Sequence, residues 1–87
     1  MVKLPFEEIN EGNSRIRIFS KDSNDHELKW HFDKEDRFVE LLEDTDWEFQ
    51  FDNDLPVPFP KKILIPKNEW HRVIKGSKDL KIRIKTF

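Results

Sequence analysis

The chain has no cysteine, only two glycines and no long apolar run. The missing cysteine, in a chain of 87 residues, excludes disulfide bonds, thiolate chemistry and every zinc site that uses cysteine ligands. A chain of this length forms a single domain with a small core. Because no disulfide can add stability, a bound metal ion or a second subunit could supply it instead.

No apolar segment reaches the length of a signal peptide or of a membrane-spanning helix. The N-terminal run from Met1 to Phe6 breaks off at Glu7 and Glu8. We therefore expect a soluble, cytoplasmic protein with no membrane partner.

Charge is unevenly distributed, although the net charge is only −2. Residues 1–60 hold 16 Asp and Glu against 7 Lys and Arg, whereas residues 61–87 hold 2 against 9. A basic tail could attract nucleic acid or phosphate. The basic residues alternate with apolar ones, which favours basic strands lying beside acidic strands in one sheet. Nucleic acid is therefore not an expected partner.

Short segments with strand periodicity follow one another at hairpin-like spacing. Alternating or aromatic-rich patterns predict strands at 15–19, 27–33, 37–43, 47–51, 62–65, 70–74 and 80–85. Residues 37–43 also show helical spacing, but they lie between strand patterns, so we predict a strand there. Residues 55–60 contain three prolines and form an edge strand or an extended connection. The pattern predicts an all-β barrel or sandwich over residues 15–87, preceded by an N-terminal arm at 1–14.

Two Trp-His pairs contain the candidate site residues. Side chains alternate along a strand, so His31 and Asp33 share one face of the predicted strand 27–33. His71, on a distant strand, could oppose them. Two imidazoles and one carboxylate form the ligand set of non-haem iron sites. The alternative for each histidine is an ordinary hydrogen-bonded core residue.

The tryptophans lie on the faces opposite the histidines. If the histidines point inward, Trp30, Phe32 and Trp70 point outward and need cover. The N-terminal arm could supply that cover, and so could a second copy of the chain. Stacking of a sugar or a base on the tryptophans is a less favoured alternative.

The two histidine segments resemble the two signature motifs of the cupin superfamily. The first motif runs Gly, five residues, His, one residue, His, three or four residues, Glu, six residues, Gly; from the first His onward its positions are taken by His31, Asp33, Arg37 and Asp44. The second runs Gly, five residues, Pro, one residue, Gly, two residues, His, three residues, Asn; its positions are taken by Pro60, Pro66, Asn68, His71 and Lys75. The resemblance covers roughly residues 26–85.

The cupin resemblance implies a small antiparallel jelly-roll barrel, and it suggests the homodimers common in that superfamily. It also implies one divalent metal ion inside the barrel, held in many cupins by three histidines and a glutamate. Here Asp33 stands at the second His position and Arg37 at the Glu position. At two glycine positions stand Asp44 and Asn68, residue types that tolerate left-handed turns.

The metal ligands expected here are His31, Asp33 and His71, with iron, manganese, zinc or nickel as the ion. The order His-x-Asp followed by a distant His also resembles the 2-oxoglutarate-dependent oxygenases, in these three residues alone. The chain looks too short for the co-substrate pocket of those enzymes.

Arg37 supports two opposite readings, because a guanidinium cannot ligate a metal. It could pair with Asp33 and occupy the metal's place, or it could bind an acidic ligand beside a metal. Glu43 and Gln50 are further candidates for lining the ligand pocket, Glu43 as a partner of Arg37. The expected ligand is a small acidic molecule.

Three functions are compatible with these residues. The first is a metal-dependent enzyme, such as an oxygenase or isomerase, that acts on a small acidic molecule. The second is a non-catalytic binding module that keeps the cupin fold without a metal. The third, a nucleic-acid-associated protein, is opposed by the acidity of the chain.

Overall fold

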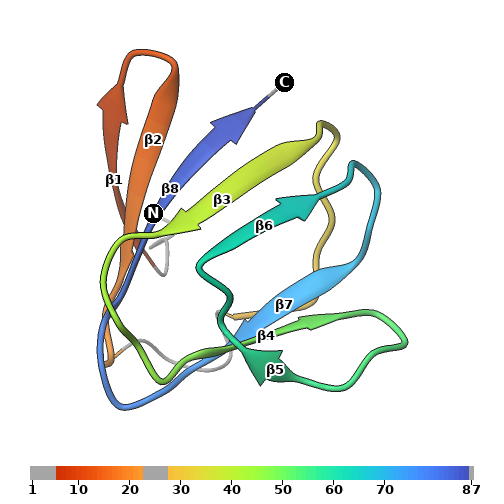
Figure 1. Ribbon diagram of the computed structural model, residues 1–87. Coiled ribbons are helices and arrows are strands. Elements are labelled where there is room, and N and C mark those ends of the chain that lie inside the picture. The colour runs from red at the N-terminus through yellow and green to blue at the C-terminus, as the bar shows by residue number, and fades with distance from the viewer. Residues whose placement is uncertain (1–5, 23–27, 87) are drawn as a thin grey trace, which may run out of the picture.

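The computed structural model describes residues 6–22 and 28–86, which form eight strands in two antiparallel sheets (Figure 1). The strands, in chain order, are β1 Phe6–Glu11, β2 Ser14–Phe19, β3 Arg37–Leu41, β4 Glu48–Phe51, β5 Val57–Pro58, β6 Lys62–Ile65, β7 His71–Ile74 and β8 Leu80–Thr86. Within these described ranges no segment is a helix long and apolar enough to cross a membrane. The prediction of an all-β fold is confirmed.

The larger sheet has five strands in the order β1-β2-β8-β3-β6, and the smaller has three in the order β5-β4-β7. Figure 1 shows the small sheet on the opposite side of the molecule from the large one. The strand ladders of residues 6–22 and 28–86 do not join the two sheets into one closed barrel. The jelly-roll barrel therefore stays a prediction.

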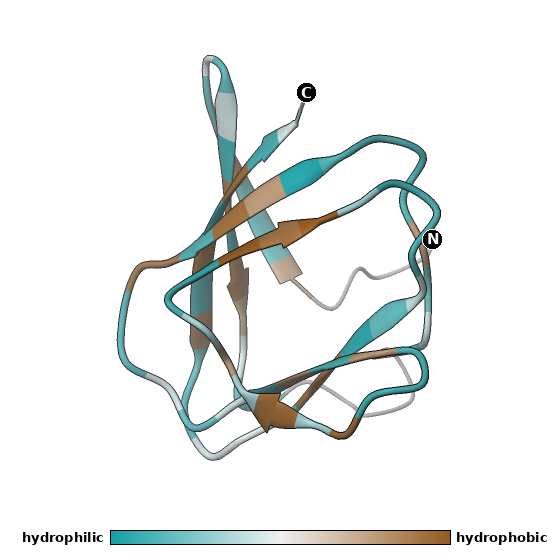
Figure 2. Ribbon diagram, turned by 45° about the vertical axis from the view of Figure 1, so that its right-hand side comes forward, coloured by the Kyte–Doolittle hydropathy of each residue, from teal (hydrophilic) through white to brown (hydrophobic). Residues whose placement is uncertain are grey.

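Strand β8 shows why the sequence forms this core. Leu80, Ile82 and Ile84 are buried, while the basic residues between them are less buried, as the strict alternation predicts. Burying one such aliphatic side chain contributes about 1.5–3 kcal/mol. The other buried apolar residues of the core are Phe19, Val39, Trp47, Phe49, Phe59 and Ile65. Figure 2 shows hydrophobic segments in strands of both sheets.

The basic residues of β8 lie near carboxylates, as expected for basic strands beside acidic segments. Lys81 Nζ lies 3.6 Å from Glu43, and Arg83 Nη2 lies 3.5 Å from Glu11. These two contacts partly neutralise the excess of positive charge in residues 61–87.

The N-terminal arm is partly ordered as strand β1. This strand pairs with β2 from Phe6↔Phe19 to Glu11↔Ser14, and the rings of Phe6 and Phe19 lie 5.2 Å apart. The hairpin turns at Gly12, whose φ of 68° favours glycine. Residues 6–11 of the predicted arm form a strand because their backbone pairs with β2 along its whole length. Residues 1–5 lie outside the described ranges.

The predicted strand at 27–33 is wrong over its described part, residues 28–33. That segment is irregular and contacts β7 through a single bridge, in which His31 and His71 exchange backbone hydrogen bonds of 3.0 and 2.9 Å. The backbone pairing does not extend beyond this bridge, because the chain that precedes β7 turns at residues 66–69 instead of running alongside residues 28–33. The N–H of Asn68 donates to Asp33 O at 2.7 Å, and Pro66 has no N–H to donate.

The remaining strand predictions agree with the structure to within two residues at each end. Residues 37–41 are a strand rather than a helix. The proline-rich segment contributes only the two-residue strand β5 at the edge of the small sheet. Asp44 and Asn68 both stand at glycine positions of the cupin motifs; Asn68 adopts a left-handed φ of 64°, whereas Asp44 does not have a positive φ.

Candidate metal centre and its cavity

Two histidines from distant parts of the chain lie side by side. His71 is the first residue of β7, and His31 lies in the irregular segment that bridges to it. The two ring centroids are 4.3 Å apart, and the Phe49 ring stacks on His71 at 5.7 Å. The two backbone hydrogen bonds between His31 and His71 therefore hold these residues opposite each other, with their imidazole rings in contact.

Each imidazole is oriented by a carbonyl two residues before it. His31 Nδ1 lies 3.0 Å from Lys29 O, and His71 Nδ1 lies 2.9 Å from Glu69 O. A carbonyl only accepts, so each Nδ1 carries the proton in these contacts, and in a neutral ring of this tautomer Nε2 is the nitrogen with the free lone pair. Metal-binding histidines are commonly fixed in this way, with the second nitrogen bonded to a carbonyl or carboxylate.

The surroundings of His71 favour its neutral form. Burial lowers its pKa below the ordinary value of 6.5, and the neighbouring His31 adds to the effect, while Asp33 and the Glu69 carbonyl oppose it. Its side chain is only 5% exposed. A neutral imidazole is the form that binds a metal.

The carboxylate of Asp33 divides its two oxygens between different neighbours. Oδ1 lies 3.4 Å from Arg37 Nη1, and Oδ2 lies 3.6 Å from His71 Nε2. Among the described residues Oδ2 is buried with no hydrogen-bond partner. With His71 neutral, Oδ2 and Nε2 are two lone-pair donors facing each other, an arrangement that a cation between them would stabilise.

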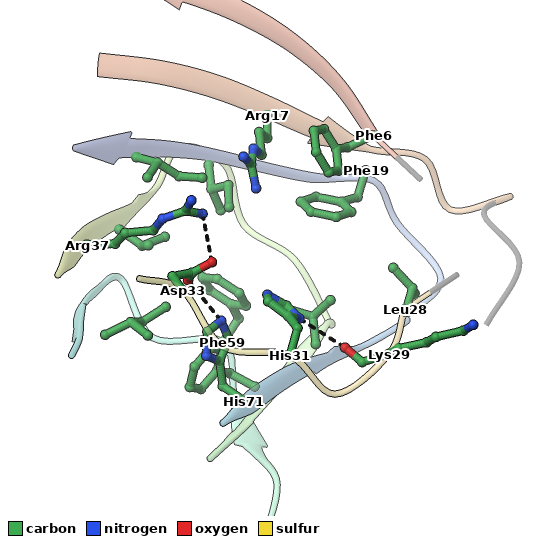
Figure 3. A pocket seen from close by; sticks show the side chains of 16 residues that line it. Phe6, Arg17, Phe19, Leu28, Lys29, His31, Asp33, Arg37, Phe59 and His71 are labelled. Atoms are coloured by element: carbon green, nitrogen blue, oxygen red, sulfur yellow. Dashed lines mark hydrogen bonds and ion pairs between the residues drawn. The ribbon is translucent and has the colours of Figure 1, made fainter. Parts of the chain in front are cut away.

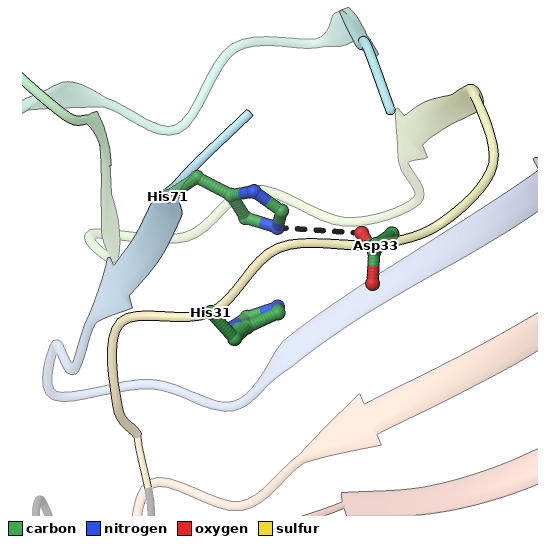
Figure 4. A group of neighbouring side chains, drawn as sticks. All are labelled: His31, Asp33 and His71. Carbon is green, nitrogen blue, oxygen red and sulfur yellow. Dashed lines mark ion pairs between the residues drawn. The ribbon is translucent and has the colours of Figure 1, made fainter. Parts of the chain in front are cut away.

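The three side chains fit a divalent metal ion (Figure 4). One ligand atom from each of His31, Asp33 and His71 lies within 4.8 Å of the others. Metal–ligand bonds of about 2.0–2.2 Å place donor atoms roughly 3–4 Å apart, so a small inward movement would bring all three to bonding distance. The unpartnered oxygen and the two free Nε2 atoms supply the expected donor set of two imidazoles and one carboxylate.

Arg37 lies beside the three donor residues and pairs with the Asp33 oxygen that does not face His71. Its guanidinium contacts Asp33 Oδ1 and, at 3.3 Å, Glu35. It thus takes one oxygen of Asp33 and leaves the other facing His71. Arg37 Nε is itself buried without a hydrogen-bond partner among the described residues. The contact between Arg37 and Asp33 is present, whereas occupation of the metal's place by Arg37 stays a prediction.

A cavity of about 340 Å³ adjoins the three donors (Figure 3). Its wall includes His31, Asp33, His71 and Arg37, and most of its other lining side chains are apolar. The apolar residues come from both sheets and from the segment after residue 27: Phe6, Phe19, Leu28, Val39, Phe49, Phe59, Ile65, Val73, Ile82 and Ile84. A small molecule in this cavity would contact the candidate metal ligands.

Glu43 and Gln50 do not line the cavity, contrary to the sequence-based expectation. Strand β3 ends at Leu41, so its alternation does not extend to Glu43, whose side chain is 68% exposed near Lys81. Gln50 pairs across the small sheet with Arg72 and accepts a 2.8 Å hydrogen bond from its Nε. That face is opposite the one that carries Phe49 and His71.

Arg17 is a cavity residue that the sequence analysis missed. Alternation correctly separates Arg15 and Arg17 from Ile16 and Ile18, but it does not say which face is inward. The register pairs Arg17 with the buried Ile82, which places both side chains on the inner face. Phe19 lies two residues after Arg17 and therefore on the same face of the strand. This large apolar residue was the feature of the sequence that could have identified the Arg17 face as inward.

The three aromatic residues expected to face outward are exposed. Phe32 and Trp70 lie edge to face at 4.9 Å, and the guanidinium of Arg72 lies 4.8 Å from the centroid of Trp30. Strand β1 belongs to the other sheet, and its Phe6 packs on Phe19 instead. The described part of the arm therefore does not cover these rings.

Comparisons with known proteins identify the fold. No profile of a known protein family matches the sequence, and no curated protein matches it. A cupin domain from Bordetella pertussis Tohama I superposes over 100% of this chain and 98% of its own, with a TM-score of 0.62 and 12% identity. A protein from Neisseria meningitidis matches 100% of this chain and 88% of its own, with a TM-score of 0.60 and 15% identity.

A third solved structure is that of HppE in its iron(II) form. It matches 85% of this chain but 41% of its own length, with a TM-score of 0.62 and 16% identity. HppE is also similar in a complex of its iron(II) form with an alternative substrate. These likenesses establish that the chain has a cupin-type fold.

Proposed function

We propose that this cupin-fold chain binds one divalent metal ion through His31, Asp33 and His71 and acts as a metal-dependent enzyme on a small acidic molecule. The observation that carries the proposal is a group of three ligand atoms, one each from His31, Asp33 and His71, that lie within 4.8 Å of one another. Within it, Asp33 Oδ2 lies 3.6 Å from His71 Nε2 and has no hydrogen-bond partner among the described residues. Such an unsatisfied buried oxygen costs about 1–3 kcal/mol unless something binds it.

With only three protein ligands, the centre would keep coordination positions open for water or substrate. This donor set, with open positions, is typical of non-haem iron(II) sites. The iron(II) form of HppE, which has a similar fold, supports iron as the first candidate; manganese, zinc and nickel remain candidates. When bound, the ion supplies Lewis acidity toward a substrate oxygen.

The residues around the donors have separate roles in this proposal. The carbonyls of Lys29 and Glu69 hold the protons of the two Nδ1 atoms and so keep both Nε2 atoms free. Arg37 holds Asp33 through Oδ1 and provides a cation beside the cavity for an acidic substrate. The apolar walls exclude water from the substrate.

Elemental analysis of untagged protein tests this proposal. We expect about one iron, manganese, zinc or nickel per chain in the wild type and little metal in His31→Ala or His71→Ala, because each removes one of three ligands. His26→Ala, which changes the only remaining histidine, is the matched control and should keep its metal.

Two results would contradict the proposal. One is wild-type protein that takes up none of the four metals when they are supplied. The other is equal metal content in all three histidine variants.

A second candidate is a metal-free binding module, and the Arg37–Asp33 contact of 3.4 Å favours it. In that case the guanidinium neutralises the carboxylate without a metal. Arg37→Ala would then change the affinity for an acidic ligand in protein shown by elemental analysis to be metal-free.

A further inference from the structure

We infer that Arg17 is a second anion-binding residue of the cavity and that the cavity takes a small organic oxyanion, a carboxylate or a phosphonate, with an apolar body. This inference deepens the proposed function, because it names the substrate class of the same cavity. Its evidence comes from Arg17, which lies on the cavity wall opposite the metal ligands.

The cavity has an excess of positive charge, although the chain as a whole is slightly acidic. Its lining includes Arg17, Lys29 and Arg37 but only one carboxylate, that of Asp33. Figure 3 shows the guanidiniums of Arg17 and Arg37 directed toward the same space above Asp33, whereas the amine of Lys29 points away. Two guanidiniums thus face one carboxylate, and a metal ion would increase the excess further.

The nearest carboxylate to Arg17 does not remove this excess. Glu8 lies 2.9 Å from Arg17 Nε, but it also lies 3.7 Å from Arg15 Nη1, so one carboxylate serves two arginines. Burial lowers the pKa of Arg17, with the Glu8 hydrogen bond opposing that effect. A buried guanidinium retains its proton and is stabilised by a further anion.

Arg17 is held in place for such contact. Its guanidinium carbon lies 4.3 Å above the Phe6 ring, and only its Nε is used by Glu8 in the hydrogen bonds formed. The planar fork of arginine suits an oxyanion with two or more oxygens. Phe6, Phe19 and Leu28 line the same cavity and would contact an apolar body.

Arg15 provides a matched comparison. It lies on the same strand and the same face as Arg17 and also contacts Glu8, yet it does not line the cavity. If both arginines only paired with Glu8 in the β1–β2 hairpin, neither substitution would change ligand binding in folded protein. A ligand-binding role makes only Arg17 important for binding.

The experiment measures binding of butanoate, butylphosphonate and neutral butanamide by calorimetry. Full-length protein is used after metal removal, and metal content is checked by elemental analysis. We expect the two anions to bind more tightly than butanamide. Arg17→Met should weaken anion binding about 10- to 100-fold, the range for losing a charge-assisted hydrogen bond, while Arg15→Met should stay within about twofold.

Two further variants keep the test decisive if Arg17→Met unfolds. Glu8→Gln removes the competing carboxylate and should tighten binding of both anions, and Arg17→Lys should bind them more weakly than the wild type because the fork is lost. Circular dichroism confirms that each variant is folded before binding is measured.

Three outcomes would overturn the inference: equal binding of butanamide and the anions, unchanged anion binding in the folded Arg17 variants, or equal losses in Arg15→Met and Arg17→Met. Failure of the proposed function looks different. In that case the metal-free protein binds the anions through Arg17, yet the wild type takes up no metal.

Discussion

Two aspartates in this molecule show opposite ways of placing a carboxylate. The oxygens of Asp46 accept hydrogen bonds from Ser77 N at 2.9 Å, Ser77 Oγ at 2.5 Å and Lys78 N at 3.2 Å. The side chain of Asp33, in contrast, is 10% exposed, and its buried Oδ2 has no hydrogen-bond partner among the described residues. A carboxylate whose oxygens accept several hydrogen bonds stabilises a loop. A buried carboxylate oxygen that accepts none indicates a site where a ligand could bind.

The surroundings of the two carboxylates explain the difference. Asp46 precedes Trp47, which is fully buried and whose Nε1 donates to Lys78 O, so the two loops are fixed together at both residues. Asp33 lies between cationic and imidazole groups that come from other segments.

Asp33→Asn and Asp46→Asn should separate metal binding from stability. Loss of a direct ligand should lower metal affinity by about 100-fold or more, beyond the roughly 10- to 100-fold loss seen for outer contacts. Asp46→Asn should leave metal affinity unchanged and lower the free energy of unfolding. Metal titration and urea denaturation of both variants measure the two effects, and equal metal affinity in both variants would remove the contrast.

Gly76→Ala should disrupt the Asp46 loop. A Cβ at Gly76 would lie 2.8 Å from the backbone carbonyl carbon of Asp46 and closer still to its carboxylate. We expect a loss of about 1–3 kcal/mol in the free energy of unfolding, as for other overpacked sites.

Gly12→Ala is the control for the Gly76 substitution. It has nothing within 4 Å of the added Cβ, but its φ of 68° is unfavourable for alanine, so it should cost about 1 kcal/mol. Urea denaturation measures both variants. A Gly76→Ala protein as stable as the wild type would show that the Asp46 loop moves to accommodate the added methyl group without lowering the free energy of unfolding.

Arg37→Met should raise metal affinity about tenfold, because it removes a cation beside the metal and releases Oδ1 of Asp33. Competition with a coloured chelator measures the change. A decrease in affinity would show instead that Arg37 is needed to hold Asp33 in place. Arg83→Met, on the outer face of β8 near Glu11, is the control and should not change metal affinity.

The pH dependence of stability should reveal Asp46. The hydrogen bonds from Ser77 lower its pKa from 3.8 to about 2 in the folded protein. The unfolded chain therefore binds the proton more readily, so the contribution is complete above pH 3.8 and is lost as the pH falls toward 2. Urea denaturation across this window should show a steeper decline for the wild type than for Asp46→Asn, and parallel curves would contradict the assignment.

Much of the fold could be predicted from local patterns. The alternation of β8, the aromatic strand β4 and the proline-rich edge appear in the structure close to the predicted bounds. Strand β1 could not be found in this way, because its partner β2 rather than its own apolar pattern stabilises it. Residues 28–33 alternate like a strand but have no full-length partner, since the facing chain turns at Asn68.

The candidate site was predicted in identity but not in arrangement. His31, Asp33 and His71 come together as the cupin resemblance implied. Glu43 and Gln50 point elsewhere, because strand β3 ends before Glu43 and the small sheet turns Gln50 away from the cavity. Arg17 joins the cavity through its register with β8, and pairing over such a distance in the sequence is not readable from a short pattern.

The residue types of the donor set, the spacing of its two histidines and one aspartate, and the alternation that buries the core can all be read from the sequence. The division of the Asp33 oxygens between Arg37 and His71, and the choice of the inward face of β2, depend on the folded arrangement. The reason is physical: local periodicity follows from the chain's own geometry, whereas contacts between distant residues follow from strand register and from which segment turns first.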